Sequence, residues 1–74
     1  MGKLNILGPE GHTEVSWELR DTDTTDDVRR RFDDLVRSGF LTYRTDPATN
    51  ESELIRTFDR FAQTITALRP IQGG

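Results

Sequence analysis

The spacing of apolar residues changes along the chain from a period of two to a period between three and four, and this change limits the folds open to it. In the stretch that ends at Leu19, apolar or β-branched residues occupy every second position, as a half-buried strand requires. Leu4 and Ile6 alternate in the same way, and Gly8-Pro9-Glu10-Gly11 between the two runs favours a chain reversal. The first twenty residues are therefore predicted to form a β-hairpin, with one face built from Thr13, Val15, Trp17 and Leu19.

The helical period begins after a polar stretch. Residues 21–27 read Asp-Thr-Asp-Thr-Thr-Asp-Asp, and they offer hydroxyls and carboxylates to the free backbone N–H groups at the start of a helix. The helix is predicted to span about Thr25 to Ser38. Gly39 is placed to end it, because glycine tolerates the left-handed conformation that follows many helices. The apolar stripe, with spacings of i, i+4, i+7 and i+8, consists of Val28, Phe32, Leu35 and Val36.

Strand-like alternation returns in the second half of the chain. Leu41 and Tyr43 share one face of a third predicted strand, which the turn-forming residues 46–52 end. Ile65 and Ala67 occupy alternate positions of a last strand that Pro70 ends, because proline has no N–H to donate. The remaining predicted boundaries are a short fourth strand within Glu53 to Phe58, a single helical turn over residues 59–62, and the last strand from Thr64 to Arg69.

This order of elements is typical of an α+β fold, in which one helix covers one face of a mixed four- to five-stranded sheet. A chain of 74 residues is long enough for one core only. We expect a single domain over residues 1–71, followed by a flexible tail over residues 72–74. The core is predicted to join the hairpin, the helix and the last strand through Trp17, Val28, Phe32 and Ile65.

Composition argues against several classes of function. The chain has no cysteine, which excludes a disulfide, a thiolate zinc site and a cysteine nucleophile, and His12 is its one histidine. A formal charge of −3 argues against nucleic-acid binding, and no apolar run approaches the roughly 20 residues of a membrane span. The acids of residues 21–27 lack the EF-hand pattern, and Arg29-Arg30-Arg31 is interpreted as a solvated helix face. We expect a monomeric cytoplasmic protein that is not an enzyme and binds no metal, cofactor, nucleic acid or membrane.

The ending Gly73-Gly74 is the motif with the most evident chemistry. Average composition would place glycine at both positions in only about one chain in two hundred. The two glycines leave the carboxylate of Gly74 without neighbouring side chains and permit backbone angles that other residues resist. Such a carboxylate can enter a narrow activating site, be adenylated with ATP and pass to a sulfur or nitrogen nucleophile. The alternative is an ending that has no function.

The helix start and the tail resemble two branches of the ubiquitin-like proteins. Asp23-Thr24-Thr25-Asp26-Asp27-Val28 is similar to the Asp-Thr-x-x-x-Val that opens the helix of ubiquitin. The ending Arg69-Pro70-Ile71-Gln72-Gly73-Gly74 resembles the tail of bacterial sulfur carriers, in particular the small subunit of molybdopterin synthase. The tail differs from the basic approach to the glycines of ubiquitin, and residues 59–63 replace the Gly-Asp turn of the sulfur carriers.

The resemblance implies a ubiquitin-like β-grasp fold and a bacterial protein modifier. An adenylating enzyme that uses ATP would activate Gly74, and conjugation would join it to target amines through isopeptide bonds. The expected partners are this enzyme, a transfer enzyme and a deconjugating metalloprotease. Two alternatives stay open: a sulfur carrier with a C-terminal thiocarboxylate for cofactor or RNA thiolation, and a non-covalent β-grasp interaction module.

Two sets of side chains follow from this interpretation. Lys3 is the one lysine, and it is the expected side-chain acceptor if copies are joined in chains. Leu68 falls at an outward position that belongs, in ubiquitin, to an apolar recognition patch. The expected partner-binding segment consists of Leu68, Arg69, Pro70, Ile71 and Gln72.

Overall fold

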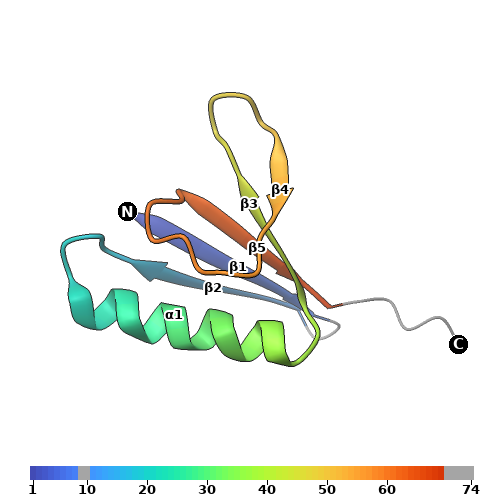
Figure 1. The fold of residues 1–74 in the computed structure, drawn as a ribbon, viewed down its shortest axis with the longest axis horizontal. Coiled ribbons are helices and arrows are strands. Elements are labelled where there is room, and N and C mark those ends of the chain that lie inside the picture. Colours follow the sequence, from blue (N-terminus) through green and yellow to red (C-terminus); the bar gives the residue numbers. More distant parts are fainter. Residues whose placement is uncertain (9–10, 70–74) are drawn as a thin grey trace, which may run out of the picture.

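The computed structural model describes residues 1–8 and 11–69, in which the chain forms five strands and one helix (Figure 1). The α+β class and the mixed sheet that the sequence predicts are confirmed. In chain order the elements are β1 (Gly2–Gly8), β2 (Gly11–Trp17), α1 (Thr22–Arg37), β3 (Leu41–Thr45), β4 (Ser52–Leu54) and β5 (Thr64–Leu68).

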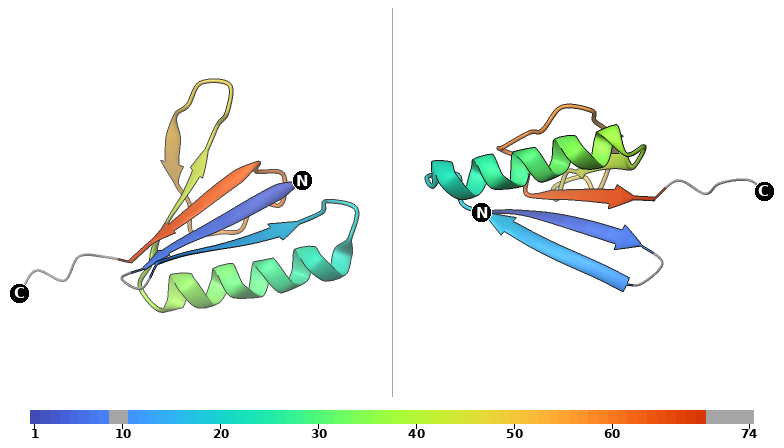
Figure 2. Two further views of the ribbon diagram at one scale, coloured as in Figure 1. Left: turned by 180° about the vertical axis from the view of Figure 1, so that it is seen from behind. Right: turned by 90° about the horizontal axis from the view of Figure 1, so that it is seen from below.

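The five strands form one sheet in the order β2-β1-β5-β3-β4. The central strands β1 and β5 are parallel, and the other neighbouring strands are antiparallel. Helix α1 covers one face of the sheet (Figure 2), which we call the inner face. Among residues 1–8 and 11–69, no helix lies on the opposite face, which we call the outer face.

The predicted hairpin is confirmed, with β1 and β2 paired from Gly2 opposite Trp17 to Gly8 opposite Gly11. The indole ring of Trp17 lies directly against Gly2, where a Cβ atom would come within 2.1 Å of the ring. Glycine is therefore required at this close approach. The prediction that Leu19 lies on the same face as Trp17 is wrong. Strand β2 ends at Trp17, and Leu19 is 40% exposed.

Helix α1 begins at Thr22, three residues before the predicted start. The side chain of Asp21 accepts hydrogen bonds from the backbone N–H groups of Asp23 and Thr24 at 3.1 and 3.3 Å, so Asp21 is the N-cap. Thr25 lies inside the first turn and is buried. The helix ends at Arg37 with Ser38 as its C-cap and Gly39 follows at a φ of +90°, so the predicted end is confirmed.

Strand β4 is shorter than predicted and covers only Ser52–Leu54. Immediately after it, Ile55 donates its backbone N–H to the carbonyl of Thr42 at 2.9 Å, and the hydroxyl of Thr42 donates to the carbonyl of Ile55. Beyond this pair the chain leaves the sheet, and Phe58 packs against the core. Because the chain leaves the sheet where Phe58 packs against the core, β4 ends earlier than the alternation in the sequence indicates.

The core lies between the inner face and α1 and contains all four predicted residues. The rings of Trp17 and Phe32 both meet Phe58 in edge-to-face contacts, with centroid distances of 5.0 and 5.7 Å. The predicted inward positions of Ile65 and Ala67 are confirmed, since both are fully buried. The buried apolar residues are Leu4, Trp17, Val28, Phe32, Ala62, Ile65 and Ala67.

Candidate functional site

A row of three leucines crosses the outer face at one end of the sheet. Leu68 is the last residue of β5, and it lies opposite Leu7 of β1 on one side and Leu41 of β3 on the other. Residues paired across strands share a face, so the three side chains are neighbours. Leu7 is 38% exposed and Leu41 is 40% exposed, and Leu68 is half-buried between them. We call Leu7, Leu41 and Leu68 the outer apolar row.

The outer face becomes more polar with distance from this row. In the next row, Tyr43 lies between Thr66 of β5 and Leu54 of β4, which is 47% exposed. The row after that contains Thr64 and Thr45. Apolar side chains therefore gather at the end of the sheet where β5 ends, and the opposite end is polar.

The packing of β5 explains why Leu68 points outward. Ile65 and Ala67 are buried against the helix side, and alternation along a strand then places Thr66 and Leu68 on the outer face. Arg69 follows as an exposed residue. Two members of the predicted partner-binding segment, Leu68 and Arg69, thus lie at the end of the outer apolar row.

The rest of the predicted conjugation site lies outside the described residues, which end at Arg69. This applies to the activation residues Gly73 and Gly74, and to Pro70, Ile71 and Gln72 of the predicted partner-binding segment. The division between a domain ending at residue 71 and a tail of residues 72–74 lies there as well.

Lys3 is on the outer face but far from Leu68. It pairs in register with Thr64, the first residue of β5, whereas Leu68 is the last residue of the same strand. Its ammonium group lies 3.2 Å from a carboxylate oxygen of Glu14, and 53% of its side chain is exposed. The predicted acceptor is therefore accessible, and it lies at the opposite end of the strand from the outer apolar row.

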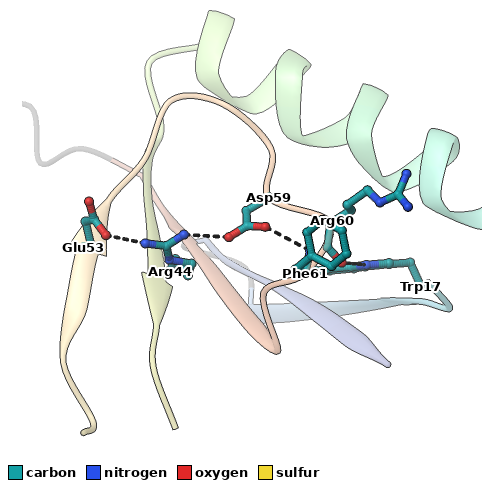
Figure 3. A network of polar contacts seen from close by, with 6 residues as sticks. All are labelled: Trp17, Arg44, Glu53, Asp59, Arg60 and Phe61. Carbon is teal, nitrogen blue, oxygen red and sulfur yellow. Dashed lines mark hydrogen bonds and ion pairs between the residues drawn. The ribbon is translucent and has the colours of Figure 1, made fainter. Parts of the chain in front are cut away.

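A polar cluster that sequence reasoning missed joins β3, β4 and the loop before β5 (Figure 3). The guanidinium of Arg44 binds Asp59 at 2.6 Å and also binds Glu53. The hydrogen bond from Arg44 holds the pKa of the Asp59 carboxyl below its ordinary value, and the backbone N–H of Phe61 adds to this effect. The cross-strand pair of Arg44 and Glu53 could have been found only from the register of β3 and β4. The cluster orders the loop, and Arg44 engages both of its carboxylates.

Other titratable residues have structural partners. His12 lies 3.2 Å from the side-chain oxygen of Asn5 on the exposed part of the hairpin. On α1, Arg29 pairs with Asp26 and Arg30 pairs with Asp27 across single helical turns. Within residues 1–8 and 11–69, no group of three or more His, Cys, Asp or Glu side chains is arranged to hold a metal ion. The helix of this described part is too short and polar to cross a membrane.

Comparison with known proteins adds no assignment. No protein-family model, curated protein or solved structure matches the chain.

Proposed function

We propose that the chain is a ubiquitin-like β-grasp protein whose Gly74 carboxylate is activated and joined to amines of target proteins. The sheet order β2-β1-β5-β3-β4, with parallel central strands and one helix between β2 and β3, supports a β-grasp assignment. The observation that carries the proposal is that β5, the strand leading into the Gly-Gly sequence, ends in the outer apolar row at Leu68. An enzyme that binds this row contacts the part of the fold from which residues 69–74 continue.

The chemistry requires a free carboxylate on Gly74. In the first step this carboxylate attacks the α-phosphorus of ATP on the activating enzyme, and pyrophosphate leaves. A thiolate of the enzyme then displaces AMP to form a thioester, and a target amine displaces the thiolate to form an amide bond. Glycine at both final positions keeps the reacting carbonyl free of side chains during these transfers.

The outer apolar row supplies the recognition surface in this proposal. Leu7 and Leu41 leave more than a third of their surface in water, although the core would gain from burying such residues. A partner that covers the row removes this apolar surface from water, at about 25 cal/mol for each Å² buried. Arg69, exposed at the edge of the row, adds a positive charge that an acidic side chain of the partner can bind.

A sulfur carrier is the second candidate, and the tail sequence favours it. Pro70-Ile71-Gln72-Gly73-Gly74 is similar to the ending of the small subunit of molybdopterin synthase. The first step would be the same adenylation, after which a sulfide donor attacks the acyl carbon, AMP leaves with one oxygen and a thiocarboxylate forms. The two candidates therefore differ in the acceptor and share the activated residue.

The test combines ATP–pyrophosphate exchange with measurement of the intact mass, using a cognate adenylating enzyme. Wild-type protein should support ATP-dependent exchange, and deletion of Gly73 and Gly74 should abolish it without changing the unfolding midpoint. Protein adducts would favour the modifier, and a mass gain equal to sulfur replacing oxygen would favour the carrier. Exchange that survives the deletion would show that the Gly74 carboxylate is not the activated group, and would refute both candidates.

A matched pair of leucine variants tests the recognition surface. Leu41 in the outer apolar row and Leu19 in the turn before α1 are both 40% exposed. Leu41→Ser should raise the KM for this protein in the exchange reaction by about tenfold, since a buried leucine side chain contributes roughly 1.5 to 3 kcal/mol. Leu19→Ser should leave the KM within about twofold. Equal effects of both variants would show that the row is not the surface that the enzyme reads.

A further inference from the structure

A groove separates the β3–β4 hairpin from the loop that leads into β5. Its volume is about 710 Å³, within the range of sites that bind small ligands or side chains. Arg44 pairs in register with the buried Ile65, so the groove opens on the side of the sheet that carries α1. The outer apolar row lies on the opposite face, and both surfaces can be occupied at the same time. The lining includes Arg44, Asp46, Glu51, Glu53, Asp59 and Phe61.

The groove carries an excess of negative charge. Four carboxylates line it, and Arg44 is the one cation among its lining residues. Arg44 is already engaged by Glu53 and Asp59. Asp46 and Glu51 make no ion pair with any described residue. The lining residues thus carry a net charge of −3, which favours a cationic occupant.

The aromatic side chain of Phe61 is exposed to solvent beside these carboxylates. Phe61 is 70% exposed, although the turn that carries it is tied down on three sides. Its backbone N–H donates to Asp59 at 2.9 Å, the carbonyl of Arg60 accepts from the indole of Trp17 at 3.0 Å, and Ala62 is buried in the core. The Phe61 ring is therefore presented to solvent by an ordered backbone.

One side of the Phe61 ring is already occupied. The guanidinium of Arg60 lies 5.0 Å from the ring centroid, in a cation–π contact. The apolar contact surface for a partner is the rest of the ring together with the small side chains that line the groove, Pro47, Ala48 and Ala62. Peptide-binding surfaces commonly combine an aromatic side chain with neighbouring charged groups.

We propose that this groove binds a segment of a partner protein in which an arginine or lysine stands beside an apolar side chain. The cationic group binds Asp46 and Glu51, the two carboxylates left free by the Arg44 cluster, and the apolar side chain packs on Phe61. A second copy of this chain is a poorer occupant, because each copy has a formal charge of −3. The proposal concerns a different surface from the conjugation chemistry and does not depend on it.

The test is an NMR titration of ¹⁵N-labelled protein with the blocked peptide Gly-Arg-Leu-Arg-Leu-Gly in low salt. The expected shifts are confined to the amides of residues 44–53 and 59–63. Phe61→Ser should weaken binding about tenfold, as the loss of one aromatic anchor does. Glu51→Gln should weaken it several-fold, and Glu18→Gln, which removes another exposed carboxylate outside the groove, should leave the Kd within about twofold.

Four results would overturn the proposal. The first is equal binding of the charge-reversed peptide Gly-Glu-Leu-Glu-Leu-Gly. The second is a shift pattern centred on the acids of α1 or on the outer apolar row. The third is an unchanged Kd for Phe61→Ser in a protein whose spectrum shows that it is folded. The fourth is a concentration-dependent dimer that shifts the groove amides without peptide, which would make a second copy the occupant.

Discussion

Trp17 donates its indole N–H to the backbone carbonyl of Arg60 at 3.0 Å, across 43 positions of the sequence. The bond ties the end of β2 to the loop before β5 (Figure 3). The same tryptophan fills the space over Gly2 and meets Phe58 edge to face. One side chain therefore fixes both the end of the hairpin and the loop that presents Phe61.

Replacement of Trp17 by phenylalanine should destabilise this loop more than it destabilises the sheet. The variant removes the donor to Arg60, and an unsatisfied, partly buried carbonyl costs about 1 to 3 kcal/mol. Urea unfolding should show at least this loss, because the smaller phenyl ring also leaves space over Gly2 and beside Phe58. The hydrogen-exchange rate of the Ala62 amide should rise more than the rates of the β1 amides. Leu19→Ala, at an exposed position, should stay within about 0.5 kcal/mol of wild type. A uniform rise in exchange across the chain would contradict the local role.

Phe32→Ala tests the predicted stripe of the helix. The Phe32 side chain is fully buried between α1 and the sheet, and its removal should cost about 3 to 5 kcal/mol. A domain of this size has roughly 4 to 11 kcal/mol in total, so the variant should lose a large share of its stability. A loss below about 1 kcal/mol in a denaturant melt would show that the stripe is not buried as described.

Gly2 and Gly8 give a matched pair at the two ends of β1. A Cβ at Gly2 would lie 2.1 Å from the Trp17 ring, whereas at Gly8 the nearest heavy atom is a backbone oxygen 3.9 Å away. Gly2→Ala should therefore cost about 1 to 3 kcal/mol through overpacking, and Gly8→Ala should cost less than half of that. Thermal unfolding of the two single variants measures the difference. Equal melting temperatures of the two variants would show that the Trp17 ring does not lie against Gly2.

Much of the fold can be predicted from local patterns, and the site only in part. Alternation in the hairpin and the stripe on α1 depend on near neighbours, so Trp17, Val28 and Phe32 were identified from spacing alone. Leu7 was not identified as part of a surface, because it is out of phase with Leu4 and Ile6. Its role depends on the register between β1 and β5, which are separated by more than fifty residues. No local pattern encodes that register.

The helix start and the Arg44 cluster show the same limit in different ways. Several residues between 21 and 25 can cap a helix, and the choice of Asp21 depends on how the chain leaves β2. Asp59 lies in a segment without periodicity, and it meets Arg44 only after the loop folds back over the sheet. A hairpin with its turn at residues 46–51 would place Arg44 opposite Glu53, and this pairing is the signal from which the cluster could have been found.

The Arg44 cluster predicts a change in stability in acid. Arg44 holds the pKa of Asp59 below its ordinary value of about 3.9, so the ion pair contributes stability above this pH. The contribution falls as the pH drops through about 4 toward the lowered pKa. Asp59→Asn should remove this part of the acid dependence and change the stability at neutral pH only slightly, since the Arg44 side chain is 38% exposed and water screens the pair. Urea midpoints at pH 7, 4 and 3 measure it. If the urea midpoints of wild type and Asp59→Asn fall equally with pH, the Arg44–Asp59 pair is not a source of the acid sensitivity.

Chain formation under the proposed function depends on how few amines the molecule offers. Nine of its ten basic residues are arginine, whose guanidinium is a poor nucleophile, so Lys3 supplies the one side-chain amine. Its side chain is more than half exposed, and its pairing with Glu14 is a surface ion pair that holds it weakly. Lys3 also lies at the other end of β5 from Leu68, so an enzyme on the outer apolar row leaves it open to a second copy.

Any homopolymer should therefore be linked through Lys3 or the amine of Met1, and Lys3→Arg protein with a blocked N-terminus should form single-copy products only. Glu14→Gln, which removes the ion pair and keeps the lysine, should still form chains, because the attacking group is unchanged. The measurement is mass spectrometry of digested products from a reaction with the adenylating and transfer enzymes. Linkage peptides that join Gly74 to any other residue of a second copy would show that another nucleophile is used, and that the surface offers acceptors besides Lys3.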